Sequence, residues 1–205
     1  MKIFQSLKTV TNLLKPFDGS WAVCGGIAAC VYRDVPRFTG DIDIALGCTS
    51  SANPIDIANS ILSSLGYVPM VGFVTDQTGR LIQQQALVIG REKEPGTYLG
   101  VDFLLPVLPW VQGAVSRAQE NRLDYGFDRL PTVTLEDLCL AKLYALQGTP
   151  ERHTDRDDIE SILRAAARFD LGYFRAGLQS LKLSLPIDLE KLVAKYHRTA
   201  PDVVR

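Results

Sequence analysis

The 205-residue sequence predicts a mixed α/β fold with a sheet in its front part and helices in its back part. Three observations support this prediction. Short strand-like apolar runs recur as far as Leu105, and leucine and isoleucine at helical spacing dominate after Pro131. A hydrophobic fraction of 46% and a charged fraction of 22% are typical of a globular chain with a buried core. We therefore expect a core domain over 1–130 and a helical lobe over 131–205.

The front part alternates between helical and strand patterns, separated by proline, glycine and polar turns. In chain order, the expected elements are a helix over 3–14, a strand over 20–24, a helix over 27–32, a strand over 41–46, a helix over 57–65, an extended stretch over 67–74, and strands over 87–89 and 98–105. A hairpin turn is expected around 76–79, and a charged turn over 91–96.

The back part contains the patterns of four helices. Thr134 and Asp137 resemble a capping box, which indicates a helix that begins next to them and runs to Leu146. A polar interval over 148–154 separates it from a second helix that carries Ile159 and Ala166. Two more helical patterns follow, over 171–181 and 188–197.

Charge and cysteine usage narrow the possible environments. The formal net charge of −1 provides no global attraction to nucleic acid or anionic membranes, so any polyanion contact requires a local patch. The four cysteines form no Cys-x-x-Cys pair, which favours reduced thiols over a disulfide framework or zinc site. No segment approaches the roughly twenty apolar residues of a membrane helix, and the amphipathic start differs from a signal peptide. We expect a cytoplasmic protein without a membrane partner.

The strand over 41–46 carries a paired carboxylate motif. Alternate residues of a strand point to the same face, so Asp41 and Asp43 are expected side by side while Ile42 and Ile44 face the core. Two carboxylates at that spacing repel each other unless a cation neutralises them. The pattern therefore predicts a site for a hard divalent metal such as Mg²⁺, although a solvated strand end gives the same alternation.

Asp102 is a third candidate ligand because it lies within an apolar strand. A charged side chain between Val101 and Phe103 is costly unless it is paired or binds a metal. If this strand neighbours the one with Asp41 and Asp43, three carboxylates converge. Asp102 would then be a metal ligand or the base for an acceptor hydroxyl; the alternative is a buried carboxylate that accepts backbone hydrogen bonds.

The adjacent glycines Gly25 and Gly26 precede helix-favouring alanines. Without side chains, their backbone N–H groups can approach phosphate oxygens at the positive end of the following helix. Tight turns use the same pair, so the glycines alone do not distinguish the two interpretations. Together with the carboxylates, they favour a nucleotide phosphate site in which divalent ions assist in-line attack.

These residues resemble the nucleotidyltransferase superfamily of polymerase-beta-like fold. The ordered pieces are Gly25-Gly26, then Arg37-x-Thr39-x-Asp41-Ile42-Asp43, then Asp102, and they are most similar to the branch of AbiEii and MenT-type toxins. Lys142 on a helix, followed by Asp155 and Asp158, is similar to the rear motif of that branch. One departure is Gly26, since many superfamily members have a serine there whose hydroxyl contacts a phosphate.

The resemblance implies roles for further residues. Gly25, Gly26, Arg37, Thr39 and Lys142 are expected to bind the nucleotide, and Lys142 is expected to act with the three carboxylates in catalysis.

Asp155 and Asp158 share one helix face, where they would position Lys142 or the acceptor and join the catalytic set. Structural alternatives stay open: Arg37 pairing with a carboxylate, Lys142 reaching solvent, and the two aspartates stabilising a helix start.

The function that the resemblance implies is transfer of a nucleoside monophosphate from an NTP to an acceptor hydroxyl, with two Mg²⁺ ions and release of pyrophosphate. A tRNA 3′ end, a protein or a small molecule is the expected acceptor, and an antitoxin protein is an expected partner in a type IV-like toxin–antitoxin pair. The alternatives are an antibiotic-modifying nucleotidyltransferase of the aminoglycoside type, and a catalytically silent nucleotide-binding interaction module.

Overall fold

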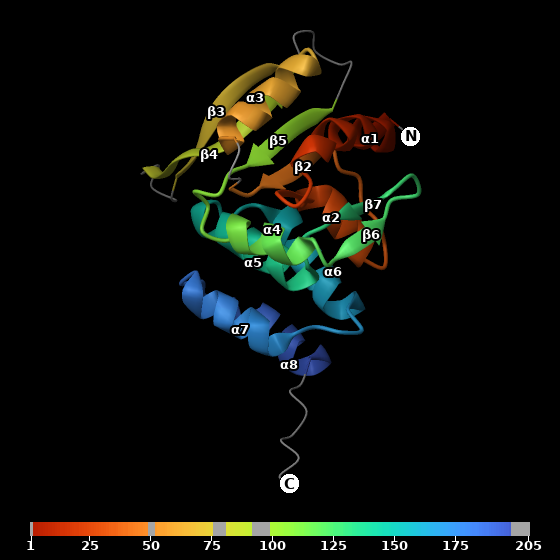
Figure 1. The fold of residues 1–205 in the computed structure, drawn as a ribbon. Helices are drawn as coiled ribbons and strands as arrows, with labels where there is room; N and C mark the ends of the chain where they lie inside the picture. Colours follow the sequence, from red (N-terminus) through yellow and green to blue (C-terminus); the bar gives the residue numbers. More distant parts are fainter. Residues whose placement is uncertain (1, 49–51, 76–80, 92–98, 198–205) are drawn as a thin grey trace.

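A five-stranded mixed sheet forms the front part of the computed structural model, which describes residues 2–48, 52–75, 81–91 and 99–197 (Figure 1). The strand order is β1-β2-β5-β4-β3, with β2 and β5 parallel and the other neighbours antiparallel. The strands are β1 (Trp21–Val23), β2 (Asp41–Leu46), β3 (Val68–Thr75), β4 (Leu81–Arg91) and β5 (Gly100–Leu104). The mixed α/β fold predicted from the sequence is confirmed.

Helices surround the sheet and then continue away from it (Figure 1). They are α1 (Lys2–Leu14), α2 (Gly25–Tyr32), α3 (Pro54–Ser64), α4 (Val111–Ala118), α5 (Leu135–Gly148), α6 (His153–Ala165), α7 (Leu171–Ser180) and α8 (Ile187–Tyr196). A 3-10 turn, η1 (Lys15–Phe17), follows α1, and a hairpin of β6 (Arg122–Asp124) and β7 (Arg129–Pro131) precedes α5. Helices α7 and α8 lie at the end of the molecule opposite the β3–β4 pair.

Two apolar clusters account for the packing on the two faces of the sheet. One face, with the fully buried Ile42, Ile44 and Phe103, packs against α1 and α3. The other face contributes Ala22 and Ala45 to a cluster with α4 to α8. Asp41 and Asp43, which lie on the same face as Ala45, are only partly buried.

The back half follows the sequence patterns closely. The Thr134 hydroxyl accepts a hydrogen bond from the Asp137 N–H at the start of α5, as the capping motif predicted. Helices α6, α7 and α8 start and end within a few residues of the predicted ranges. The domain boundary expected at 130/131 stays a prediction. Among the described helices, none is both long enough and apolar enough to span a membrane.

Other elements differ from the expectation. Helix α2 begins at Gly25 itself, so the glycines are its first turn and not a turn before it. Strand β4 extends the expected 87–89 through the polar glutamines before it, and α4 and the β6–β7 hairpin were not predicted. The expected turn over 76–79 lies outside the described residues, as does the turn expected over 91–96 except for Arg91, which is the last residue of β4. All four cysteines are free, but only Cys24 and Cys139 are buried.

Candidate functional site

Three carboxylates converge on the face of the sheet opposite α1 and α3. Asp43 of β2 is the direct cross-strand partner of Asp102 of β5, and Asp41 lies two residues before Asp43 on the same face. One oxygen from each of Asp41, Asp43 and Asp102 lies within 4.8 Å of the others. The parallel pairing of β2 with β5 therefore brings together the acidic group that the sequence predicted.

The electrostatics of this group favour a bound cation. Burial, followed by the charges of Asp41 and Asp102, raises the pKa of Asp43 to about 7, although a Gly26 hydrogen bond acts in the opposite direction. The donors are all carboxylate oxygens, which are the ligands that Mg²⁺ takes from proteins. These three residues thus fit a hard divalent ion in both charge and ligand type.

Both glycines contact the Asp43 carboxylate, and at Gly25 this contact leaves no space for a side chain. Gly25 has a φ of +59°, and a Cβ atom there would lie 1.8 Å from Asp43 Oδ2. The Gly26 N–H donates a hydrogen bond of 3.3 Å to that same oxygen. The first turn of α2 therefore directs backbone N–H groups to the acidic site, where phosphate oxygens would arrive.

Thr39 occupies the space that a side chain at Gly26 would need. A Cβ atom at Gly26 would lie 2.3 Å from Thr39 Oγ1 and 3.3 Å from Arg37 Nη2. The Thr39 hydroxyl donates to Asp41 Oδ1 at 3.0 Å. A hydroxyl group is thus present beside the helix start although the chain lacks the serine common in similar proteins.

We expect Gly25→Ala to destabilise the protein and to abolish nucleotide binding, because the new methyl group displaces the Asp43 carboxylate. Gly19→Ala is the matched control: Gly19 has a φ of +88° but no atom within 4 Å of its Cβ position. The control measures only the cost of an alanine in the left-handed backbone conformation, which is on the order of 1 kcal/mol. Thermal unfolding and NTP titration compare the variants. Equal effects of the two substitutions on NTP binding would contradict the role of Gly25.

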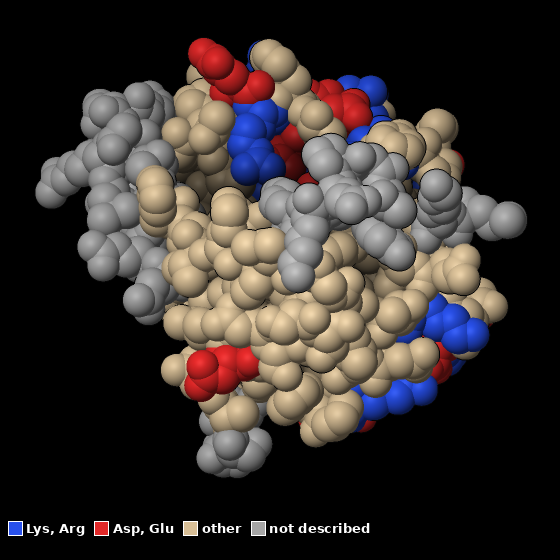
Figure 2. Space-filling model, turned by 90° about the horizontal axis from the view of Figure 1, so that it is seen from above, with Lys and Arg blue, Asp and Glu red and all other residues tan. Residues whose placement is uncertain are grey.

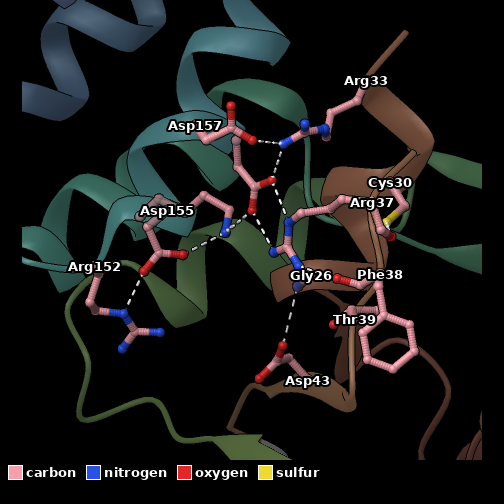
Figure 3. Close-up of polar contacts among 12 residues, drawn as sticks. Gly26, Cys30, Arg33, Arg37, Phe38, Thr39, Asp43, Arg152, Asp155 and Asp157 are labelled. Carbon is pink, nitrogen blue, oxygen red and sulfur yellow. Dashed lines mark hydrogen bonds and ion pairs between the residues drawn. The ribbon is translucent and has the colours of Figure 1, made fainter. Parts of the chain in front are cut away.

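A buried ionic cluster lies next to the acidic site and joins α2, α5 and α6 (Figure 3). Its centre is Asp158, whose side chain is 0% exposed. Arg37 donates to both Asp158 oxygens, from Nε at 2.8 Å and Nη2 at 2.7 Å. Arg33 Nη1 lies 2.6 Å from Asp158 Oδ1, and Lys142 Nζ lies 2.7 Å from Oδ2. One carboxylate therefore holds three cations.

Lys142 connects this cluster to the cleft. Its ammonium group also donates to Asp155 Oδ1 at 2.7 Å, and Arg152 Nε lies 2.6 Å from Asp155 Oδ2. The pKa of Lys142 is raised: burial lowers it, but the charges of Asp155 and Asp158 outweigh that effect. Lys142 is therefore a cation that two aspartates keep charged in a buried position.

A cleft of about 560 Å³ contains most of the predicted site residues. It is lined by Gly25, Gly26, Arg37, Thr39, Asp41, Asp43, Asp102, Lys142 and Asp155. Asp158 does not line this cleft, and it contacts Arg37 and Lys142 from behind. The nucleotide contacts expected of Arg37, Thr39 and Lys142 stay predictions, as do the catalytic roles of the two α6 aspartates.

Sequence reasoning missed Arg33, which lies outside the recognised motifs. Its guanidinium pairs with both Asp157 and Asp158 across the interface of α2 with α6. The available signal was an arginine at the end of a short apolar helix, and such a residue more often faces water. The apolar end of the cleft, formed by Leu87, Leu104 and Trp110 together with residues of α5, was also not predicted.

Comparisons with known proteins identify the family and similar folds. A sequence model of the family described as "Nucleotidyl transferase AbiEii toxin, Type IV TA system" matches residues 10–168. No curated protein sequence matches the chain. An antigenic nucleotidyltransferase-like protein from Paracoccidioides brasiliensis has a similar structure, with a TM-score of 0.53, 16% identity, and coverage of 96% of this chain and 97% of that chain. The solution structure of the antibiotic-resistance factor ANT(2'')-Ia has a TM-score of 0.47 and 12% identity over 96% of this chain and 92% of that chain.

The family match spans more than half of the sequence, and it includes both glycines, the three converging carboxylates and the Lys142 cluster. The chain therefore belongs to the AbiEii family of nucleotidyltransferase toxins.

Proposed function

We propose that the protein transfers a nucleoside monophosphate from an NTP to an acceptor hydroxyl and releases pyrophosphate. The observation that carries this proposal is the placement of Asp41, Asp43 and Asp102 beside the first turn of α2. Backbone N–H groups and carboxylates side by side suit a triphosphate that arrives with divalent cations. Asp41, Asp43 and Asp102 would hold the metal, for which Mg²⁺ is the expected ion.

The reaction forms one bond and breaks one. The acceptor oxygen bonds to the α-phosphorus of the NTP, the bond from that phosphorus to the β-phosphate oxygen breaks, and pyrophosphate leaves. Asp102, on the strand farther from α2, would accept the proton of the acceptor hydroxyl. A bound divalent ion supplies charge neutralisation on the phosphates. The N–H groups of the first turn of α2, which lie beside the carboxylates, and the Lys142 ammonium would orient the triphosphate in the cleft.

The proposal is tested with each α-labelled NTP, with the purified protein, and with RNA, protein and small-molecule acceptors supplied separately. We expect one acceptor to become labelled and pyrophosphate to appear in equal amount, in the presence of Mg²⁺ and not of EDTA. The catalytic proposal would be refuted if no NTP bound and no pyrophosphate were released with either Mg²⁺ or Mn²⁺. The protein would then be an interaction module without catalytic activity.

We further propose that this activity makes the chain the toxin of a toxin–antitoxin pair, in keeping with its family. Induced expression of the wild-type chain is expected to arrest growth, and the carboxylate variants are expected to be harmless at equal protein level. Growth arrest by an inactive variant would separate toxicity from nucleotidyl transfer.

A further inference from the structure

An apolar strip of the sheet begins beside Asp102 and runs to β3, the last strand in the sheet order. On the acidic face, the cross-strand register places Ile89 of β4 beside Asp102, and Met70 of β3 beside Ile89. Leu104 and Leu87 form the adjacent row on the same face and line the cleft. We refer to Met70, Leu87, Ile89 and Leu104 as the apolar strip.

The strip is accessible and lacks charge. Leu87, Ile89 and Leu104 are half-buried, and Met70 is 54% exposed. A Cβ atom at Gly72 would lie 3.2 Å from Ile89 Cδ1 and 3.3 Å from Leu87 Cβ, so the glycine keeps this part of the strip shallow. An exposed apolar surface that adjoins a reactive site marks a place where a substrate binds.

We propose that the strip binds the acceptor, and that the acceptor is an extended polypeptide segment that presents a serine, threonine or tyrosine hydroxyl to Asp102. This inference rests on the proposed function and specifies its substrate class. Its first support is continuity: the acceptor oxygen must reach Asp102, and the strip is the surface that leads away from Asp102 on the side opposite α2.

The second support is charge. In the described part of the chain, the arginines and lysines that line the cleft are Arg37, Lys142 and Arg152, and each forms an ion pair with Asp155 or Asp158. An RNA acceptor would need cations for its phosphates. Figure 2 shows acidic and basic side chains meeting in a hollow, beside a stretch of surface whose described side chains carry no charge. An uncharged polypeptide segment matches these conditions.

The third support is shape. The strip ends at β3, which is the edge strand among the described strands of the sheet, so a polymer can extend beyond the strip on that side. The path from β5 to β3 crosses two strand spacings, about 10 Å, which an extended peptide spans with about three residues. An apolar residue about three positions from the modified hydroxyl would therefore lie on Met70 and Ile89.

The test uses short synthetic peptides with a central serine, threonine or tyrosine and either leucine or lysine about three positions away, chosen for the strip length. With the wild-type protein, Mg²⁺ and labelled NTP, we expect the leucine peptides to be labelled about tenfold more efficiently than the lysine peptides. Total RNA serves as the competing acceptor. Labelling of RNA with no labelling of any peptide would overturn the proposal.

Met70→Gln and Val71→Gln form the matched pair of variants. Met70 and Val71 are 54% and 51% exposed on the same strand, but Val71 pairs with Val88 on the opposite face. We expect Met70→Gln to lower kcat/KM for the leucine peptide by about fivefold to tenfold with an unchanged Kd for NTP, and Val71→Gln to leave both values unaltered. Equal effects of the two substitutions would overturn the proposal that the strip binds the acceptor. Absence of NTP binding in the wild type would instead overturn the underlying function.

Discussion

Replacing Asp43 with asparagine is expected to lower nucleotidyl transfer by about a thousandfold or more, because it removes a charge from the group that neutralises the reacting phosphates. Asparagine keeps the shape of the side chain and still accepts the hydrogen bond from the Gly26 N–H. The first turn of α2 is therefore expected to stay in place. Pyrophosphate release and label transfer at saturating NTP measure the loss.

The same substitution is expected to stabilise the metal-free protein at alkaline pH. The pKa of Asp43 is raised to about 7 from its ordinary 3.8, chiefly by burial. When the pKa of a carboxyl group is higher in the folded than in the unfolded state, the folded state becomes less stable as pH rises toward the folded-state pKa. The wild-type Tm without metal should therefore fall between about pH 4 and about pH 7, while the Tm of Asp43→Asn changes less over this range. Asp34→Asn, at an exposed position, is the control.

If Asp43→Asn is more stable than the wild type yet inactive, Asp43 serves the site and not the fold. Removal of a purely structural carboxylate would instead lower the stability. If Asp43→Asn retained wild-type transfer, the metal site assigned to the three carboxylates would be wrong. Addition of Mg²⁺ should raise the Tm of the wild type more than that of the variant, since binding to the folded state alone adds stability.

The acidic group was predictable because it depends on local rules. Strand alternation places Asp41 and Asp43 on one face from sequence alone, and the cost of a charge in an apolar strand singles out Asp102. Only the pairing of β2 with β5 had to be assumed, and the register of Asp43 with Asp102 confirms it. Helix caps such as Thr134 follow from equally local hydrogen bonds.

What could not be predicted depends on contacts between distant segments. Arg33 meets Asp158 only because α6 packs against α2, and no periodicity in either helix specifies that approach. Thr39 packs so closely against Gly26 that no side chain fits there, and this contact exists only in the folded chain. Short elements such as the three-residue strands of the β6–β7 hairpin contain too few residues to establish a period.

The second large effect is expected for Asp158→Asn, which we predict to lower the free energy of unfolding by about 3–5 kcal/mol, because it leaves buried cations without a counter-charge. The side chains of Asp158, Lys142 and Arg33 are 0%, 6% and 9% exposed, so water cannot compensate for the lost charge. Asp157→Asn is the matched control at the neighbouring position. The Asp157 side chain is 61% exposed, and its one ion pair among the described residues is with Arg33, so its loss should cost less than about 1 kcal/mol.

The pH dependence of this difference identifies its cause. Burial raises the pKa of Asp158, but hydrogen bonds from Arg37 and the charge of Lys142 outweigh burial and lower the pKa from 3.8 to about 2. A lowered pKa means that the stabilisation is present above pH 4 and is lost as pH falls toward 2. Chemical denaturation at several pH values should therefore show the gap between wild type and Asp158→Asn shrinking in acid. A gap that is independent of pH would indicate a packing defect.

Activity of the same variant tests how α6 contributes to the site. Among the described residues that line the cleft, Asp158 contacts Arg37 and Lys142, and we predict that it acts as a positioning residue. At a temperature where Asp158→Asn stays folded, the Kd for NTP should rise while the metal dependence of the remaining transfer stays that of the wild type. Asp158→Glu, which keeps the charge on a longer side chain, should restore stability more than NTP affinity, because NTP binding needs both Arg37 and Lys142 in their positions. Equal recovery of both properties would place Asp158 in folding alone.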